Sequence, residues 1–520
     1  MNKSIFTIAF CLSAAASFVA GAQTTFPHSA SEDKAGVMSK AYWDIWNSDV
    51  QARIDADIET NRKADACIVL DGIRPGTEVK VEQISSDFYF GAHLFNYNQL
   101  GKKEYNDRYK ELYGTLFNSA TVAFYWKVFE TEPGRLRFVE EYWDTEDYWN
   151  SCEDPMHQPH WRRPATDPVV EFCISKGLRI HGHTLVWGNR KWQHPMWLTT
   201  GIKDPEERAA MERMIVEYGN LQNYKDSETY SDEYKALTPA ELSAKFPHFS
   251  EQFVNAFDSR IRTIAERYKG VISSWDVVNE SSTDYERGLL GDGSILTKSI
   301  YGIMPGDYPY RAFKVAAESF PEYVKLNIND YNLGQCYVDE VNDIRSRGGK
   351  IDVMGSQMHL FNPKQCLDIA DGAAIQTPEH VYGWYGRLSK AGLPIHLSEI
   401  TITAPGNDER GRQIQAVITR NLYRLWFSLP QMNGITWWNV VDNCGAPGEP
   451  SVSGLFTRDM QPKTSYYALD ELINHEWKTS LTVRADDEGK VTFRGFKGKY
   501  ILTWTDRKGR VHTEECHVGD

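Results

Sequence analysis

The sequence has few long apolar runs and a deficit of positive charge, and each shortage excludes a class of protein. Beyond residue 22, no run of apolar residues approaches the ~20 needed to cross a bilayer as a helix, so we expect no membrane span. Lysine and arginine number 57 against 71 aspartate and glutamate, which gives a formal charge of −14. Because affinity for nucleic acid rests on neutralising phosphates, we expect no nucleic-acid partner.

Cysteine is also scarce. The chain of 520 residues has eight cysteines, and none of their spacings is typical of a zinc site. Internal repeats and low-complexity segments are absent as well, which argues against a solenoid or a disordered chain. We therefore expect an ordinary globular protein that needs neither a metal nor a cofactor.

The first residues have the composition of an export signal. In "MNKSIFTIAFCLSAAASFVAGAQ", basic Lys3 precedes an apolar stretch from Ile5 to Ala20, and small residues follow at the expected cleavage point. Residues 1–22 are thus predicted to be a cleaved signal peptide, and the mature protein to be secreted or periplasmic and monomeric. Cys11 follows bulky Phe10, which disfavours a lipid anchor.

The middle of the chain alternates short apolar runs with long amphipathic stretches. The eight runs are "FYFGAH", "SATVAFYW", "LRIHGHTLVWG", "VISSWDVVNE", "VKLNINDYN", "IDVMGSQMHL", "LPIHLSEITI" and "NGITWWNVVD". This alternation predicts an α/β fold, a (β/α)8 TIM barrel over residues 86–476. Polar, aromatic-bearing insertions are expected at about 141–165 and 200–250. The second could be a solvated elaboration or a lid over the barrel mouth.

Both ends of the mature chain have strand patterning. Residues 23–85 contain a helix candidate, with an apolar stripe from Trp46 through Val50 and Ile54 to Ile58, and then strands around a Pro-Gly turn. Residues 477–520 return to strands separated by glycine turns. We expect the strands of the two ends to pair as a small β module.

Two glutamates are expected at the barrel mouth. The apolar strand in "GVISSWDVVNESS" ends abruptly at Asn279 and Glu280, and burying a carboxylate there is costly unless it has a partner or a function. Glu399 ends the strand in "PIHLSEITI". Because the carboxyl ends of barrel strands share one pocket, the two carboxylates should meet there, as glycoside hydrolysis requires of its acid and its nucleophile.

Further polar and aromatic side chains follow the same strand ends: Lys127, His183, Trp187, Asn279, Gln357, His359 and Trp438. A flat indole beside hydrogen-bonding groups is well suited to hold a sugar ring. These residues are the candidate substrate-binding set, and the expected partner is a polysaccharide or an oligosaccharide.

Seven segments in order resemble glycoside hydrolase family 10: "HGHTLVWG", "RYKGVISSWDVVNE", "KLNINDYN", "VMGSQMHL", "LPIHLSEITI", "GITWWNVVD" and "GLFTRDMQPKTSYYAL". The resemblance covers about residues 88–472 and implies a retaining endo-β-1,4-xylanase. It implies Glu280 as the acid/base and Glu399 as the nucleophile. It also implies that Asn279 holds the 2-hydroxyl of the sugar and that Tyr331 lines the leaving-group side. The residues that it implies on the non-reducing side of the cut are His183, Trp187, Lys127, Gln357 and Trp438.

The sequence departs from the family pattern at three places. Ala123 and Phe124 stand where the family carries a carboxylate and an amide for the second sugar. Phe124, Tyr125 and Trp126 could instead close that side or stack on a different sugar. Thr401 replaces the aspartate expected to partner His359. The loop after the last strand reads "NCGAPGEPSVSG" in place of a tryptophan-bearing loop.

These departures leave the substrate open between xylan, a decorated relative of xylan and a different glycan. Two other classes of function also remain open. A glycan-binding protein on an enzyme scaffold would bind without releasing product. His181 and His183 in a His-x-His pattern would suit a metal-dependent barrel hydrolase, although no further ligand set completes a site.

Overall fold

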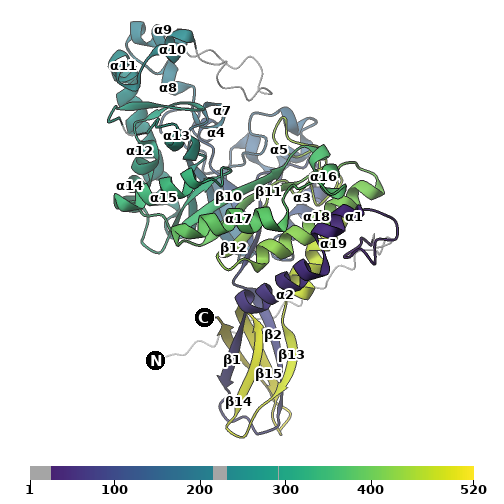
Figure 1. Cartoon of the computed structure of the whole chain (residues 1–520). Coiled ribbons are helices and arrows are strands. Elements are labelled where there is room, and N and C mark those ends of the chain that lie inside the picture. The colour runs from purple at the N-terminus through teal and green to yellow at the C-terminus, as the bar shows by residue number, and fades with distance from the viewer. Residues whose placement is uncertain (1–24, 215–230, 291, 520) are drawn as a thin grey trace, which may run out of the picture.

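The computed structural model describes residues 25–214, 231–290 and 292–519 as a closed barrel of eight parallel strands with helices around it (Figure 1). The expected signal peptide lies outside these residues. The barrel strands are β3 (Tyr89–His93), β4 (Ser119–Ala123), β5 (Arg179–Trp187), β6 (Ser274–Asn279), β9 (Lys325–Asp330), β10 (Val353–Leu360), β11 (Ile395–Ile402) and β12 (Met432–Trp437). Each corresponds to one of the eight predicted runs, so the predicted (β/α)8 barrel is confirmed.

Helices follow every barrel strand and cover the outside of the barrel. The longest after each strand are α3 (Lys103–Glu111), α6 (Thr166–Ser175), α12 (Pro247–Tyr268), α14 (Tyr308–Ser319), α15 (Gln335–Ser346), α17 (Pro378–Leu388), α18 (Glu409–Ser428) and α19 (Thr464–Asp470). A single π-helical turn (Glu471–Glu476) continues α19. Their buried faces carry the apolar residues that the amphipathic stretches predicted.

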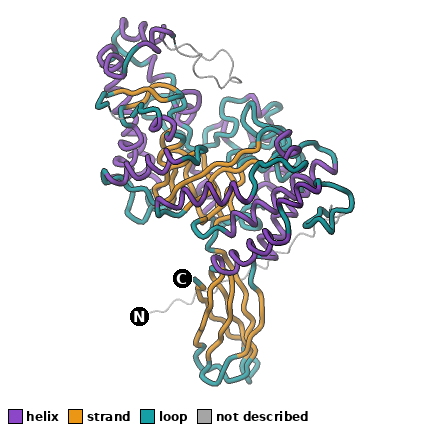
Figure 2. Tube along the Cα trace, viewed as in Figure 1, coloured by secondary structure: helices purple, strands orange, loops and turns teal. Residues whose placement is uncertain are grey.

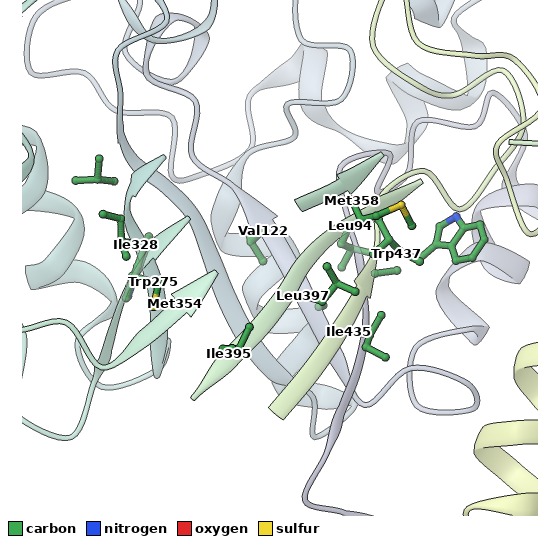
Figure 3. Packing of buried hydrophobic residues seen from close by; sticks show 14 of the residues in the cluster. Leu94, Val122, Trp275, Ile328, Met354, Met358, Ile395, Leu397, Ile435 and Trp437 are labelled. Atoms are coloured by element: carbon green, nitrogen blue, oxygen red, sulfur yellow. The ribbon is translucent and has the colours of Figure 1, made fainter. Parts of the chain in front are cut away.

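Large side chains pack between the barrel and its helices (Figure 3). Trp275 on β6 is fully buried, and its ring lies 4.7 Å from the ring of Phe124 and 5.4 Å from that of Phe320. Gly182 on β5 pairs with Trp275 across the sheet, and a Cβ atom added at Gly182 would come within 2.2 Å of the indole. The large side chain of Trp275 therefore requires a glycine at position 182, the first glycine of "HGHTLVWG".

Gly182→Ala is expected to lower the free energy of unfolding by about 3 kcal/mol or more, because neither the indole nor the strand has room to move. Gly386→Ala is the matched control. Gly386 is exposed in α17 and has no atom within 4 Å of an added Cβ, so this variant should gain about 0.5–1 kcal/mol of stability. Denaturant unfolding measures both changes. Equal stability of the two variants would contradict the packing described here.

Strands from both ends of the chain form a β module beside the barrel (Figures 1 and 2). β1 (Lys63–Val69) pairs with β14 (Lys490–Phe496). β2 (Glu78–Ser86) lies between β13 (Ser480–Arg484) and β15 (Gly498–Thr505), and β16 (Val511–Val518) completes that sheet. The two ends therefore pair as expected.

The module has its own core and sits at the amino-terminal ends of the barrel strands. Val79, Val81 and Leu502 are fully buried within it. Arg62, at the end of α2 (Ser48–Arg62), donates hydrogen bonds to the carbonyl oxygens of Phe427 and Leu429, just before β12 begins. The module is thus remote from the carboxyl ends of the strands, where the polar residues gather.

The remaining elements form the amino-terminal segment, the loops at the barrel mouth and, at Ser389–Ala391, the connection from α17 into β11. They are α1 (Lys40–Ile45), α4 (Trp126–Phe129), η1 (Tyr142–Asp144), α5 (Glu146–Ser151), η2 (Pro155–His157), α7 (Arg190–Gln193), α8 (Trp197–Thr200), α9 (Pro205–Met214), α10 (Asp232–Ala236), α11 (Pro239–Lys245), α13 (Ser282–Glu286), the hairpin β7 (Leu296–Ser299) and β8 (Gly302–Pro305), α16 (Pro363–Ala370) and η4 (Ser389–Ala391). Part of the expected insertion at 200–250, residues 215–230, lies outside the described residues.

Two features are absent from the described residues: a membrane-spanning helix and a disulfide bond. None of their helices combines the length and apolarity needed to cross a bilayer. The seven cysteines among them are all unpaired: Cys67, Cys152, Cys173, Cys336, Cys366, Cys444 and Cys516.

Candidate active site

The carboxyl ends of the barrel strands open into a cleft of about 1000 Å³. Nine of the ten residues predicted for the site line it: His183, Trp187, Asn279, Glu280, Tyr331, Gln357, His359, Glu399 and Trp438. They come from six barrel strands and the segments that directly follow them, so the shared strand polarity brings residues far apart in sequence into one cavity.

Lys127 is the exception, and here the structure differs from the prediction. After β4 the chain turns directly into α4, which places Lys127 outside the set of residues that line the cleft. Its ammonium group lies near His194, whose pKa falls to about 3 because of burial and of the neighbouring cations Arg190 and Lys127. Tyr125 lines the cleft at this point instead.

Glu280 lies directly after β6 in a left-handed backbone conformation, with φ at 57°. Its backbone N–H donates to the carbonyl oxygen of Asn329 at 2.7 Å. Three side chains hold the carboxylate: the Trp187 indole donates to Oε2 at 3.0 Å, the Tyr301 hydroxyl to Oε2 at 3.1 Å and the Gln357 amide to Oε1 at 3.2 Å. A non-glycine residue adopts this conformation at an energetic cost. In Glu280 the conformation aims the carboxyl group into the cleft.

The surroundings of Glu280 favour its protonated form. Burial is the largest cause, and the negative charges of Glu399 and Asp330 add to it, so that the pKa of Glu280 rises to about 8. The hydrogen bonds from Gln357 and Tyr301 act in the opposite direction. A carboxyl group in this position can hold a proton at neutral pH and donate it.

Glu399 on β11 is held differently from Glu280. The Asn329 amide donates to its Oε1 at 2.8 Å, and the Asn329 Oδ1 in turn accepts from Ser398. His359 Nε2 lies 3.4 Å from Oε2, and His183 Nε2 lies 3.9 Å from Oε1. The Asn329 amide therefore holds one oxygen of this carboxylate, and an imidazole lies beside each oxygen.

A buried carboxylate below the cleft orients His183. Asp276 Oδ2 lies 2.9 Å from His183 Nδ1 and 2.9 Å from His181 Nε2. Burial alone would lower the pKa of His183, but the hydrogen bond to Asp276 and the charge of Glu399 raise it above its usual value. The two imidazoles in turn overcome the burial of Asp276 and hold its pKa well below the usual range.

The predicted change of partner at His359 is present in the structure. Its Nδ1 lies 2.9 Å from the hydroxyl of Thr401, where the family pattern has a carboxylate. His359 therefore presents Nε2 to Glu399 with a neutral group behind it.

Several residues of the cleft were not predicted. Asn329 does not line the cleft but is the direct hydrogen-bond partner of Glu399 beneath it. Tyr301 reaches Glu280 from the hairpin β7–β8. Arg162 and Arg163 come from the insertion at 141–165. The only sequence signal for the arginines was an aromatic-rich, arginine-bearing insertion after strand β4.

Burial and the lining of the cleft bear on two expectations for flanking segments. Phe124 and Trp126 do not face the cleft but pack into the core, so of the three aromatic residues only Tyr125 lines the cavity. The described residues of the 200–250 insertion are likewise absent from the cleft lining, which does not support a lid formed by that part.

The described residues include no group of three or more histidine, cysteine, aspartate or glutamate side chains placed to hold a metal ion. His181 and His183 instead share the carboxylate of Asp276.

A parallel barrel whose mouth holds a protonatable glutamate and a second, hydrogen-bonded glutamate among aromatic side chains defines a glycoside hydrolase. The sequence model of glycosyl hydrolase family 10 matches residues 81–231 and 236–472, which is most of the chain. The protein belongs to that family.

Individual relatives are distant. Endo-1,4-beta-xylanase C of Paenibacillus barcinonensis is 25% identical over 435 residues, which cover 76% of this chain and 32% of the relative. Exoglucanase XynX of Acetivibrio thermocellus is 25% identical over 311 residues, which cover 58% of this chain and 24% of the relative. Native xylanase 10B from Thermotoga maritima matches in structure with a TM-score of 0.49 at 21% identity, over 75% of this chain and 96% of that one. The chain spans a third or less of the length of the two curated relatives.

Proposed function

We propose that the protein hydrolyses β-1,4-linked xylan, or a decorated relative of xylan, with retention of configuration at the anomeric carbon. The observation that carries the proposal is the contrast between two glutamates in one cleft. Glu280 has its pKa raised to about 8, whereas Glu399 accepts a hydrogen bond from Asn329 beside two imidazoles. The names of the relatives, xylanases and an exoglucanase, support this class of substrate.

In the first step the Glu399 carboxylate attacks the anomeric carbon of the bound sugar, and the bond to the leaving oxygen breaks. The proton of Glu280 passes to that oxygen. This leaves a glycosyl ester on Glu399 and a carboxylate at Glu280.

In the second step a water molecule attacks the same carbon from the side that the leaving group has vacated. The Glu280 carboxylate accepts a proton from the water, and the Glu399 carboxylate is released. Two inversions give net retention, and both side chains return to their starting protonation states.

The test is incubation of the purified protein with xylan, arabinoxylan, glucuronoxylan, cellulose, mixed-linkage β-glucan and xylo-oligosaccharides, with products separated by chromatography. Release of xylo-oligosaccharides of β configuration, followed by NMR at early times, is the expected result. If all xylans stayed intact while another glycan was cleaved, the proposed substrate would be wrong, but the proposed double-displacement mechanism would not be contradicted. Binding without any product would favour the glycan-binding alternative.

The acid role predicts how activity depends on pH. Because the first step requires protonated Glu280, kcat/KM should fall about tenfold per unit above pH ~8. The Tyr301 hydroxyl favours the ionised form of Glu280, so Tyr301→Phe should raise the pKa of Glu280 and move this alkaline limb to higher pH. The measurement is kcat/KM from pH 5 to 10.

Tyr331→Phe is the control for that shift. The Tyr331 hydroxyl lies 3.4 Å from the Tyr301 hydroxyl and makes no hydrogen bond to Glu280 in the structure. Its removal should leave the alkaline limb nearly in place. A shift to lower pH in Tyr301→Phe would contradict the assigned role of Tyr301.

We also propose that the protein acts outside the cytoplasm, as a secreted or periplasmic enzyme. The composition of residues 1–22 supports this. A polymeric substrate is most simply reached there.

A further inference from the structure

Three further carboxyl groups lie buried behind Glu280, outside the cleft. Asp284 on α13, Asp330 at the end of β9 and Glu340 on α15 are 0%, 1% and 0% exposed, and none of them lines the cavity. Among the described residues, no lysine, arginine or histidine forms an ion pair with any of the three. A buried carboxyl group without a cation is costly, so each must be protonated or held by hydrogen bonds.

Asp330 is held by backbone N–H groups on both of its oxygens. Oδ2 accepts from the Ser282 N–H at 2.9 Å, and Oδ1 accepts from the Asn332 N–H at 2.8 Å. Such bonds favour the ionised form and offset part of the effect of burial, so that the pKa of Asp330 rises only to about 6. Asp330 is therefore negatively charged at neutral pH.

Glu340 has the opposite surroundings. The Ser281 hydroxyl donates to its Oε1 at 2.7 Å, and its Oε2 has no hydrogen-bond partner among the described residues. Burial and the charges of Asp330 and Asp284 raise the pKa of Glu340 well above its usual value. Glu340 is therefore protonated and neutral at a pH at which Asp330 is ionised.

The hydrogen bonds at the end of β9 fix the turn that carries the general acid. The Glu280 N–H donates to the Asn329 carbonyl oxygen at 2.7 Å, and two residues later the Ser282 N–H donates to Asp330. Both ends of the turn are thus tied to β9. This support holds Glu280 at its left-handed φ of 57°, which a non-glycine residue does not adopt without cost.

Other titratable side chains face these two carboxyl groups. Those that interact with Glu280 are Glu399 of β11, His183 of β5 and Tyr301 of the β7–β8 hairpin, and those that interact with Asp330 are Asp284 of α13, Tyr308 of α14, and Cys336, Tyr337 and Glu340 of α15. Burial raises the pKa of the tyrosines and of the cysteine, so they stay neutral around pH 7. Glu399 and Asp330 are the negative charges that disfavour ionisation of Glu280.

We propose that Asp330 is a positioning residue for the general acid: its hydrogen bonds hold the Glu280 turn, and its negative charge keeps the proton on Glu280 until the leaving oxygen takes it. This proposal rests on the proposed function, since it concerns the proton donated in the first step. Asp330 touches neither the substrate nor the reacting atoms. In the second step the same charge makes the Glu280 carboxylate a stronger base towards water.

Asp330→Asn tests the charge, because the amide keeps one acceptor oxygen and the size of the side chain. The alkaline limb of kcat/KM should move to lower pH by about one unit, so that activity at pH ~9 relative to that at pH ~6 falls about tenfold further than in the unsubstituted protein. This shift is opposite to that expected for Tyr301→Phe. A purely structural role for Asp330 would lower kcat/KM equally at every pH and leave the limb in place.

Glu340→Gln is the matched control within the same buried cluster. Because Glu340 is protonated, the amide removes no charge, and its oxygen can still accept from the Ser281 hydroxyl. The alkaline limb should therefore stay where it is. A limb that moved as far in Glu340→Gln as in Asp330→Asn would overturn the assignment of the charge to Asp330.

Carbon-13 NMR of labelled glutamate carboxyl groups reads the same equilibria without turnover. The resonances of Glu280 and Glu340 are identified by their loss in Glu280→Gln and Glu340→Gln. Glu280 should titrate at lower pH in the Asp330→Asn protein, and Glu340 should remain protonated at pH ~7 in the unsubstituted protein. The second measurement needs no change at Asp330, so it decides the matter even if Asp330→Asn does not fold.

An unmoved Glu280 titration in Asp330→Asn, or an ionised Glu340 at neutral pH, would overturn the proposal and leave the proposed hydrolysis intact. If no glycan were cleaved, the proposed function would fail by itself, and the titration of Glu280 would still decide the role of Asp330.

Discussion

Glu399→Gln is expected to reduce kcat on every substrate that the protein cleaves by roughly five orders of magnitude, the scale seen when a covalent nucleophile is removed. The amide keeps the shape of the side chain but cannot form a glycosyl ester. Asn329 and His359 would remain in place around the substituted side chain, so folding should change little. Initial rates on xylo-oligosaccharides, together with a melting curve, test this.

Glu379→Gln is the control for that substitution. Glu379 is an exposed glutamate in the first turn of α17, outside the cleft, and its substitution should leave the rate unchanged. Covalent labelling provides a second readout, since a 2-fluoro glycoside of the cleaved sugar should become attached to Glu399 and to no other residue. Near-normal hydrolysis by the Glu399→Gln protein would contradict a double-displacement mechanism with Glu399 as the nucleophile.

Glu280→Ala is expected to lower kcat/KM on natural oligosaccharides by about 10²- to 10⁴-fold, because the leaving oxygen then departs without a proton. An aryl glycoside with a good leaving group needs no proton, so its first step should be affected far less. The glycosyl-enzyme should then accumulate, since no base activates water for the second step.

Azide tests the second half of that role. With Glu280 shortened to alanine, azide can attack the glycosyl-enzyme from the vacated side, release Glu399 and give a β-glycosyl azide. Rate recovery with that product is expected, and an α-glycosyl azide would contradict the assigned roles.

Glu280→Gln should also raise stability at alkaline pH. A carboxyl group whose pKa is raised on folding contributes stability below its usual pKa of 4.5, and that contribution is lost as the pH rises towards 8.

The pair of glutamates was predictable because each lies near the carboxyl end of an apolar run. Glu280 directly follows β6, and Glu399 lies three residues before the end of β11; the length and β-branching of both runs specify buried strands. Once eight parallel strands close into a barrel, their carboxyl ends must share one mouth, so placing the pair required only the order of the runs.

Lys127 shows where this reasoning fails. Its distance from the end of β4 is only four residues, but the chain turns into α4 and the side chain leaves the cleft. Local strand patterning does not specify the direction of the residues that follow a strand, because their conformation depends on what packs above them.

The sequence by itself determined the barrel, the pairing of the two chain ends and the two carboxylates. The apolar pattern of each strand can be recognised locally, and closing parallel strands into a barrel then places all their carboxyl ends at one mouth. Only the tertiary structure decided which groups surround those carboxylates. Asn329 on β9 reaches Glu399 on β11, two strands away, Tyr301 reaches Glu280 from a hairpin, and Arg163 enters from an insertion. Their positions come from long-range packing of loops and neighbouring strands, and such contacts leave no period or spacing in the sequence to be read.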